Sequence, residues 1–87
     1  MIRVDYDRSF LKSAKTLSVK LQRKLAEAIL LLQQNPFHST LHTKKLSGSL
    51  AGTLSFRITR EYRVLFQFLD ETTIQLLEVD HRKDIYR

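Results

Sequence analysis

The 87-residue sequence contains no cysteine and no tryptophan, and it has one proline and two glycines. Without cysteine the chain can form neither a disulfide nor a thiolate metal site, which fits a reducing cytoplasm. The longest apolar run, residues 28–32, is far too short to cross a bilayer. The first ten residues lack the apolar region of a secretory signal. We therefore expect one cytoplasmic domain, residues 1–87.

Acidic residues are absent between Arg8 and Ala26, a stretch that holds six cations. The whole chain carries a net charge of +6 at pH 7. A basic balance of this size indicates a polyanionic partner, which can be a nucleic acid, an anionic membrane or an acidic protein. Charge alone does not choose among them, and it also serves solubility.

The N-terminal half predicts one strand and two helices. Residues 1–6 alternate between apolar and polar side chains, which is typical of a strand. A short helix follows with Asp7 or Ser9 as its N-cap, and a longer helix begins after Ser18 and ends before Pro36. The apolar stripes of the two helices are Phe10, Ala14 and Leu17, and Leu21, Leu25, Ala28, Ile29 and Leu32.

The C-terminal half changes to a period of two. Residues 54–59, 62–69 and 73–80 are predicted strands, with a turn at 70–72. The third strand is apolar on both faces, so we expect it inside the sheet. The segment before them, residues 38–52, is predicted to be a polar loop. The fold class is α+β: an N-terminal strand, two helices, then a three-strand antiparallel meander, with the helices packed on one face of the sheet.

The strand pattern also predicts a register. If the apolar side chains share the core face, Ile58 pairs with Tyr62, and Arg57 pairs with Arg63. The two arginines then lie side by side on the face away from the helices. Like charges directly opposite each other are unfavourable. We favour an anion site at this pair over two splayed surface arginines.

Most catalytic motifs are missing. The sequence has no phosphate-binding loop of the form G-x-x-x-x-G-K-[ST] and no G-x-S-x-G segment. His38 and His42 follow Pro36 without an H-E-x-x-H motif, so we expect surface residues and no metal site. The remaining groups suit metal-free RNA cleavage, which needs a base for the 2′-hydroxyl, cations for the phosphorane and an acid for the leaving oxygen. No cofactor is expected.

The closing segment "HRKDIYR" supplies several of these groups. His81 is a candidate base or acid, and Tyr86 a candidate for stacking or proton donation. Arg57, Arg63 and Arg82 are candidates for holding phosphate. RNA cleavage by this set requires that the three arginines converge with His81 and Tyr86 on one sheet face. The alternation of side chains does not settle which face His81 uses, because the third strand is apolar on both sides. The cations expected to bind RNA are Lys44, Lys45, Arg60, Arg82, Lys83 and Arg87, the first two from the flexible loop. The plainer alternatives are a solvated basic tail, a Tyr86 that anchors the terminus and a His81 that is bonded at a strand end.

Three segments resemble the RelE/ParE superfamily of bacterial and archaeal toxins, most closely its RelE–YoeB branch. They are "NPF", "KKLSGSLAGTLSFRITREYRVLFQF" and "HRKDIYR". The resemblance implies a RelE-like fold and a toxin of a type II toxin–antitoxin pair that cleaves mRNA in the ribosomal A site without metal. It also implies phosphate-clamping roles for Arg57 and Arg63, a stacking or proton-donating role for Tyr86, and a loop-borne charged residue near Lys44 or Lys45.

The resemblance further implies a partner, a cognate antitoxin whose acidic or amphipathic segment covers the basic groove or displaces the tail, in a toxin–antitoxin hetero-oligomer. No membrane partner is expected. The chain departs from the family at Thr53 and Leu54, which replace an aromatic residue, and in the separation of His81 from Tyr86. Two alternatives stay open: a ParE-like inhibitor of DNA gyrase, and a non-catalytic module that binds RNA or antitoxin.

Overall fold

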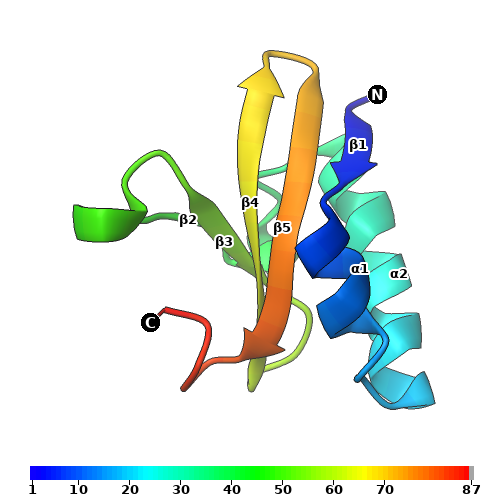
Figure 1. The fold of residues 1–87 in the computed structure, drawn as a ribbon. Helices are drawn as coiled ribbons and strands as arrows, with labels where there is room; N and C mark the ends of the chain where they lie inside the picture. The colour runs from blue at the N-terminus through cyan, green and yellow to red at the C-terminus, as the bar shows by residue number, and fades with distance from the viewer. Residues whose placement is uncertain (87) are drawn as a thin grey trace.

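Two helices cover one face of a five-stranded sheet in the computed structural model, which describes residues 1–86 (Figure 1). The helices are α1 (Arg8–Ala14) and α2 (Val19–Gln34). The strands are β1 (Arg3–Tyr6), β2 (Lys44–Lys45), β3 (Leu54–Arg57), β4 (Tyr62–Asp70) and β5 (Thr73–His81). Their order in the sheet is β1-β5-β4-β3-β2. The predicted α+β class, with an antiparallel meander of β3, β4 and β5, is confirmed.

Both helices begin at the residues that the sequence predicts. The side chain of Asp7 accepts a hydrogen bond from the backbone N–H of Ser9, and the Oγ of Ser18 accepts one from Leu21. Such caps satisfy N–H groups that have no partner inside the helix. The second helix ends at Gln34, two residues before the proline. In the described residues, neither helix has the length and apolar character needed to cross a membrane.

The first strand forms one edge of the sheet, and β2 forms the other. β1 pairs in parallel with β5, with Arg3 opposite Thr73. β5 therefore has a neighbour on each side, as its two apolar faces predict. Beyond the end of β1, α1 lies along the same edge of β5. There the Oγ of Ser13 in α1 accepts a hydrogen bond from the N–H of Val79.

The prediction of a flexible polar loop before the meander is wrong. This segment contains two 3₁₀ turns, η1 (Ser39–Leu41) and η2 (Gly48–Leu50), and the short strand β2 between them. Lys44 and Lys45 thus lie in a strand that pairs with β3. Leu41 is 1% exposed and anchors the segment to the core. A strand of two residues is too short to show a periodicity, so the sequence pattern cannot reveal it.

The core fills the space between the helices and one face of the sheet. Phe56 and Phe66 are fully buried there, with ring centroids 5.7 Å apart. Leu32 of α2 packs in the same cluster. Because side chains alternate along a strand, the neighbours of Phe56 in β3 and of Phe66 in β4 face away from the helices. Figure 1 shows the C-terminal segment on that side of the sheet, opposite α1 and α2.

Candidate functional site

The two arginines of the predicted register stand opposite each other in the sheet. Arg57 pairs with Arg63, and the N–H of Ile58 donates to the carbonyl oxygen of Tyr62 at 3.2 Å. The register predicted from the sequence is therefore confirmed. By alternation, both arginines lie on the sheet face away from the helices. They differ in exposure, because Arg57 is exposed and Arg63 is only 8% exposed.

Arg63 is bound to the protein's own backbone. Its Nη1 donates to the carbonyl oxygens of Thr59 at 3.1 Å, Arg60 at 2.8 Å and Tyr62 at 3.3 Å. These bonds shape the loop between β3 and β4, since a buried guanidinium needs acceptors in place of water. Arg57 is consequently the cation of this pair that is open to a ligand.

The C-terminal segment folds back over the same face. The N–H groups of Asp84 and Ile85 both donate to the carbonyl oxygen of His81, at 2.9 and 3.0 Å. Ile85 is 3% exposed, so the turn is fixed by burial as well as by hydrogen bonds. The next residue, Tyr86, is placed at the surface with 39% exposure.

Tyr86 reaches the middle of β3. Its hydroxyl oxygen lies 3.2 Å from the Oγ of Ser55, which is 2% exposed. The Nζ of Lys44, a residue opposite Ser55 in the register, lies 5.9 Å from the centroid of the Tyr86 ring. We call this region, formed by Lys44, Ser55, Arg57, Arg63 and Tyr86, the tail face. It combines an aromatic ring, a hydroxyl group and cations, a set that suits a nucleotide.

His81 does not lie on the tail face. It stands opposite Tyr62 in the register and contacts that ring edge-on, with centroids 5.5 Å apart, so it shares the helix-covered side of the sheet. Both ring nitrogens are engaged. Nε2 lies 3.3 Å from the Oε2 of Glu61, and Nδ1 accepts a hydrogen bond from the N–H of Lys83 at 3.1 Å. The predicted convergence of His81 and the two arginines on one face is therefore wrong.

The structure adds Glu61 to the residues around the tail. Its Oε2 also lies 3.4 Å from the Nε of Arg82, and its carbonyl oxygen accepts the N–H of Arg82 at 2.7 Å. The sequence analysis missed this residue. One signal for it exists: Glu61 is the only acidic residue between Glu27 and Asp70 in the sequence, and basic residues surround it.

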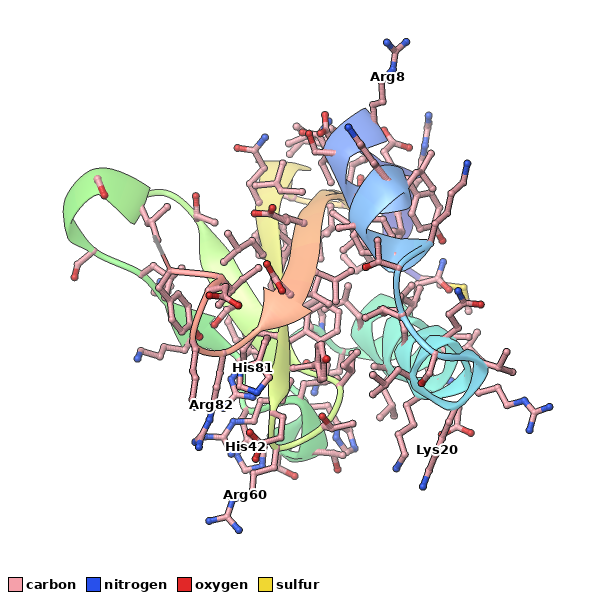
Figure 2. The ribbon with its side chains drawn as sticks, turned by 60° about the horizontal axis from the view of Figure 1, so that its bottom comes forward. Arg8, Lys20, His42, Arg60, His81 and Arg82 are labelled. Carbon is pink, nitrogen blue, oxygen red and sulfur yellow. The ribbon has the colours of Figure 1, made fainter. Side chains whose placement is uncertain are left out.

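A cleft of about 600 Å³ opens between α2, η1 and the loop after β3. Three cations, Lys24, Arg57 and Arg60, line it together with His42, and Glu27 is the acidic residue of the lining. Figure 2 shows His42 and Arg60 at the same end of the molecule as His81 and Arg82, with Arg8 pointing away at the other end. The cleft thus extends the cationic surface from Arg57 around the end of the sheet.

The remaining predicted RNA-binding residues are scattered. Lys45 lines another groove, of about 410 Å³, beside the stacked rings of Phe37 and Phe68, and it also lines the groove next to Lys44 and Tyr86. Arg82 binds Glu61, and Lys83 is exposed next to it. Arg87 lies outside the described residues.

Within residues 1–86, no three histidine, aspartate or glutamate side chains gather closely enough to hold a metal ion. The Nδ1 of His38 caps η1 by accepting the N–H of Thr40. At the opposite end of β4, hydrogen bonds from Thr72, chiefly that of its backbone N–H at 2.8 Å, lower the pKa of the Asp70 carboxyl.

A five-stranded mixed sheet with two helices on one face and a folded-back basic tail on the other defines a small toxin of the RelE/ParE superfamily. The model of the family "ParE toxin of type II toxin–antitoxin system" matches residues 4–86. The chain belongs to this family. It is a toxin of a type II toxin–antitoxin system, close to the RelE–YoeB branch, which confirms the resemblance seen in the sequence.

Known relatives support this assignment. Toxin RelG of Mycobacterium tuberculosis (strain ATCC 25618 / H37Rv) is 53% identical over 45 residues, so the match spans 51% of this chain and 51% of that relative. A chain in the toxin–antitoxin complex RelBE2 from M. tuberculosis is 30% identical, with a TM-score of 0.79 over 93% of this chain and 98% of its own length.

More distant structures share the fold. YafQ from E. coli strain BL21(DE3) has a TM-score of 0.81 at 15% identity, covering 100% of both chains. A chain of the archaeal RelE–RelB complex from Pyrococcus horikoshii OT3 has a TM-score of 0.78 at 22% identity, over 95% of this chain and 97% of that one. At these identities the likeness concerns the fold alone.

Proposed function

We propose that this toxin is a ribosome-dependent endoribonuclease that cleaves mRNA in the ribosomal A site and thereby inhibits translation in the cytoplasm. The observation that supports this most is the placement of Tyr86. Its ring lies beside the Lys44 cation and its hydroxyl meets Ser55, on the sheet face that also carries the exposed Arg57. A partly exposed ring with cations nearby suits a base and its adjoining phosphate.

The proposed reaction is a transesterification within RNA. The 2′-oxygen forms a bond to the adjacent phosphorus while the bond from phosphorus to the 5′-oxygen breaks, which leaves a 2′,3′-cyclic phosphate and a 5′-hydroxyl. Arg57 stabilises the negative charge that builds up on the phosphorane. Tyr86 donates a proton to the leaving 5′-oxygen, and a base removes the proton of the 2′-hydroxyl.

Two candidates exist for the base that removes the proton of the 2′-hydroxyl, namely His81 and a solvent water. His81 would have to release either Glu61 or the N–H of Lys83, because both of its ring nitrogens are bonded. Solvent water at the cationic face needs no such rearrangement. We therefore propose that water takes up the proton and that His81 anchors the tail.

A cognate antitoxin is the proposed protein partner. The similar chains from M. tuberculosis and P. horikoshii were both solved in toxin–antitoxin complexes. An acidic or amphipathic segment complements the cationic cleft and the tail face in charge. We propose a toxin–antitoxin hetero-oligomer in which this segment covers Arg57 or displaces the tail.

The direct test measures mRNA cleavage in a reconstituted translation system, with and without ribosomes. The wild-type toxin is compared with Arg57→Ala and with Lys15→Ala, which removes the same charge from an exposed site on the helical side. We expect cuts that need ribosomes, persist in Lys15→Ala and fall strongly in Arg57→Ala. Absence of cleavage on ribosomes would contradict the proposal.

The matching family model is named for the ParE toxins, and this favours a second candidate, inhibition of DNA gyrase without cutting nucleic acid. A supercoiling assay with purified gyrase distinguishes the two. Loss of supercoiling activity together with intact mRNA would support the second candidate. Salt-sensitive RNA binding with neither effect would instead indicate a binding module.

A further inference from the structure

We propose that Glu61 is a positioning residue, which fixes the C-terminal segment 82–86 against the loop between β3 and β4 and thereby holds Tyr86 on the tail face. The catalytic part of this inference rests on the proposed function. The anchoring part concerns the molecule alone and can be tested without any RNA.

Glu61 joins the loop to the tail at three points. Its Oε2 lies 3.3 Å from the Nε2 of His81 and 3.4 Å from the Nε of Arg82, and its carbonyl oxygen accepts the N–H of Arg82 at 2.7 Å. These contacts fall on two consecutive residues, at the point where β5 ends and the tail begins. One carboxylate oxygen of Glu61, whose side chain is 47% exposed, thus faces a nitrogen of each of two consecutive side chains.

The His81 ring is oriented for this contact. Its Nδ1 accepts the N–H of Lys83, so in the neutral ring the proton sits on Nε2, the nitrogen that faces Glu61. The ring also packs edge-on against Tyr62. A carboxylate that orients an imidazole through one nitrogen, while a backbone group binds the other, leaves the ring a single position.

The anchor is transmitted to Tyr86 through a short and rigid connection. Only three residues separate Arg82 from Tyr86. Within them, the N–H groups of Asp84 and Ile85 bind the carbonyl oxygen of His81, and Ile85 is buried. A displacement at Arg82 is consequently passed to the Tyr86 ring.

The loop that presents Glu61 is itself fixed from the opposite side. Arg63 binds two of its carbonyl oxygens, those of Thr59 and Arg60, and also that of Tyr62 at the start of β4. The rigid chain of contacts therefore runs from Arg63 through the loop to Glu61 and from there to the tail. This gives buried Arg63 a role in the site that does not require it to touch RNA.

The test compares Glu61→Ala, Glu61→Gln and Glu71→Ala. Glutamine keeps an acceptor oxygen at the same reach, so it is the conservative rescue variant. Glu71 lies in the exposed turn at the other end of β4 and β5, so its loss removes the same charge at a distance from the tail. Hydrogen exchange by mass spectrometry follows the amides of residues 82–86, and steady-state cleavage on ribosomes gives kcat and KM.

In Glu61→Ala we expect the amide hydrogens of residues 82–86 to exchange at least about tenfold faster than in the wild type. The amides of β4 and β5 should stay as protected as in the wild type. Its kcat should fall by on the order of 100-fold with little change in KM, because a misplacement of about 1 Å at the chemistry has effects of this size. Glu61→Gln should retain most of both properties, and Glu71→Ala should match the wild type.

If the amides of residues 82–86 exchange in Glu61→Ala at the same rate as in the wild type, the anchoring role is overturned. Faster exchange with an unchanged kcat would overturn the catalytic part and leave the anchor. If the wild-type toxin cuts no mRNA, the proposed function fails, and exchange alone decides on the anchor. If Glu61→Ala does not fold, Glu61→Asp replaces it, because the side chain shortened by one methylene cannot keep both contacts.

Discussion

The hydroxyl oxygen of Tyr86 lies 3.2 Å from the Oγ of Ser55, although the two residues are 31 positions apart in the sequence. This contact joins the tail to the middle of β3, on the face of the sheet that points away from the helices. Ser55 is 2% exposed, so its hydroxyl needs a partner inside the protein. The Tyr86 ring stays 39% exposed and can meet a ligand from outside.

Tyr86→Phe removes the hydroxyl and keeps the ring, so it separates the contributions of the two groups. The phenylalanine ring can keep its place beside Lys44, but it cannot donate a proton. We expect ribosome-dependent cleavage to slow by about 10²–10⁴-fold, the usual contribution of a positioned general acid. Tyr6→Phe, at an exposed tyrosine on β1, is the matched control and should cleave like the wild type. Full activity of Tyr86→Phe, with loss in Tyr86→Ala, would show that the ring acts by stacking.

Arg57→Ala and Arg63→Ala should separate activity from stability. Arg63 is buried and its Nη1 donates to backbone carbonyls, so its removal should lower the free energy of unfolding by about 1–3 kcal/mol. Arg57 is exposed, so its removal should change stability by less than about 0.5 kcal/mol while cleavage is lost. Urea unfolding and single-turnover cleavage of each variant measure the two effects. An Arg63→Ala protein as stable as the wild type would contradict this division.

The lowered pKa of the Asp70 carboxyl predicts that the stability of the fold depends on pH in the acid range. Its carboxyl has a folded-state pKa below the ordinary value of 3.8, mainly because the N–H of Thr72 donates to it. A lowered pKa means that the ionised form stabilises the fold above pH 3.8, and this contribution is lost as the pH falls through the lowered value. Thermal unfolding should therefore show a wild-type advantage over Asp70→Asn at neutral pH that disappears in acid. A constant difference at all pH values would contradict it.

Leu41→Ala tests the ordered segment that the sequence analysis took for a loop. Leu41 is 1% exposed, and truncation of such a core leucine costs about 2–5 kcal/mol. We expect faster hydrogen exchange at β2 as well, because η1 leads directly into that strand. Leu30→Ala is the control, since Leu30 is 61% exposed and its loss should be nearly neutral. Unchanged exchange at β2 would show that η1 does not hold the strand.

The regular elements could be predicted from the sequence because their patterns are long and consistent. Sixteen residues of amphipathic helix after Ser18 and the alternation over residues 62–69 leave little choice of structure. The register of Arg57 with Arg63 followed from the same alternation, because a slip of one residue would expose the core side chains. The short strand β2 gave no such signal, as two residues carry no period.

The site could be predicted only in part. Tyr86 was identified, but its contact with Ser55 depends on a chain reversal that no local pattern announces. His81 could not be assigned to a face, because Leu76 and Val79 are both buried although they are three residues apart, and an irregularity in the ladder shifts the alternation there. Glu61 was overlooked because its partners follow twenty residues later in the sequence.

The parallel pairing of β1 with β5 has a consequence for the order of events during synthesis. Arg3 finds its partner only when Thr73 has been made, about seventy residues later. The first strand of a nascent chain therefore stays without its sheet partner until β5 has been made, and the sheet cannot close before that point. The Tyr86 tail follows β5, so under the proposed function the cutting face forms only after the strand that completes the sheet has been made.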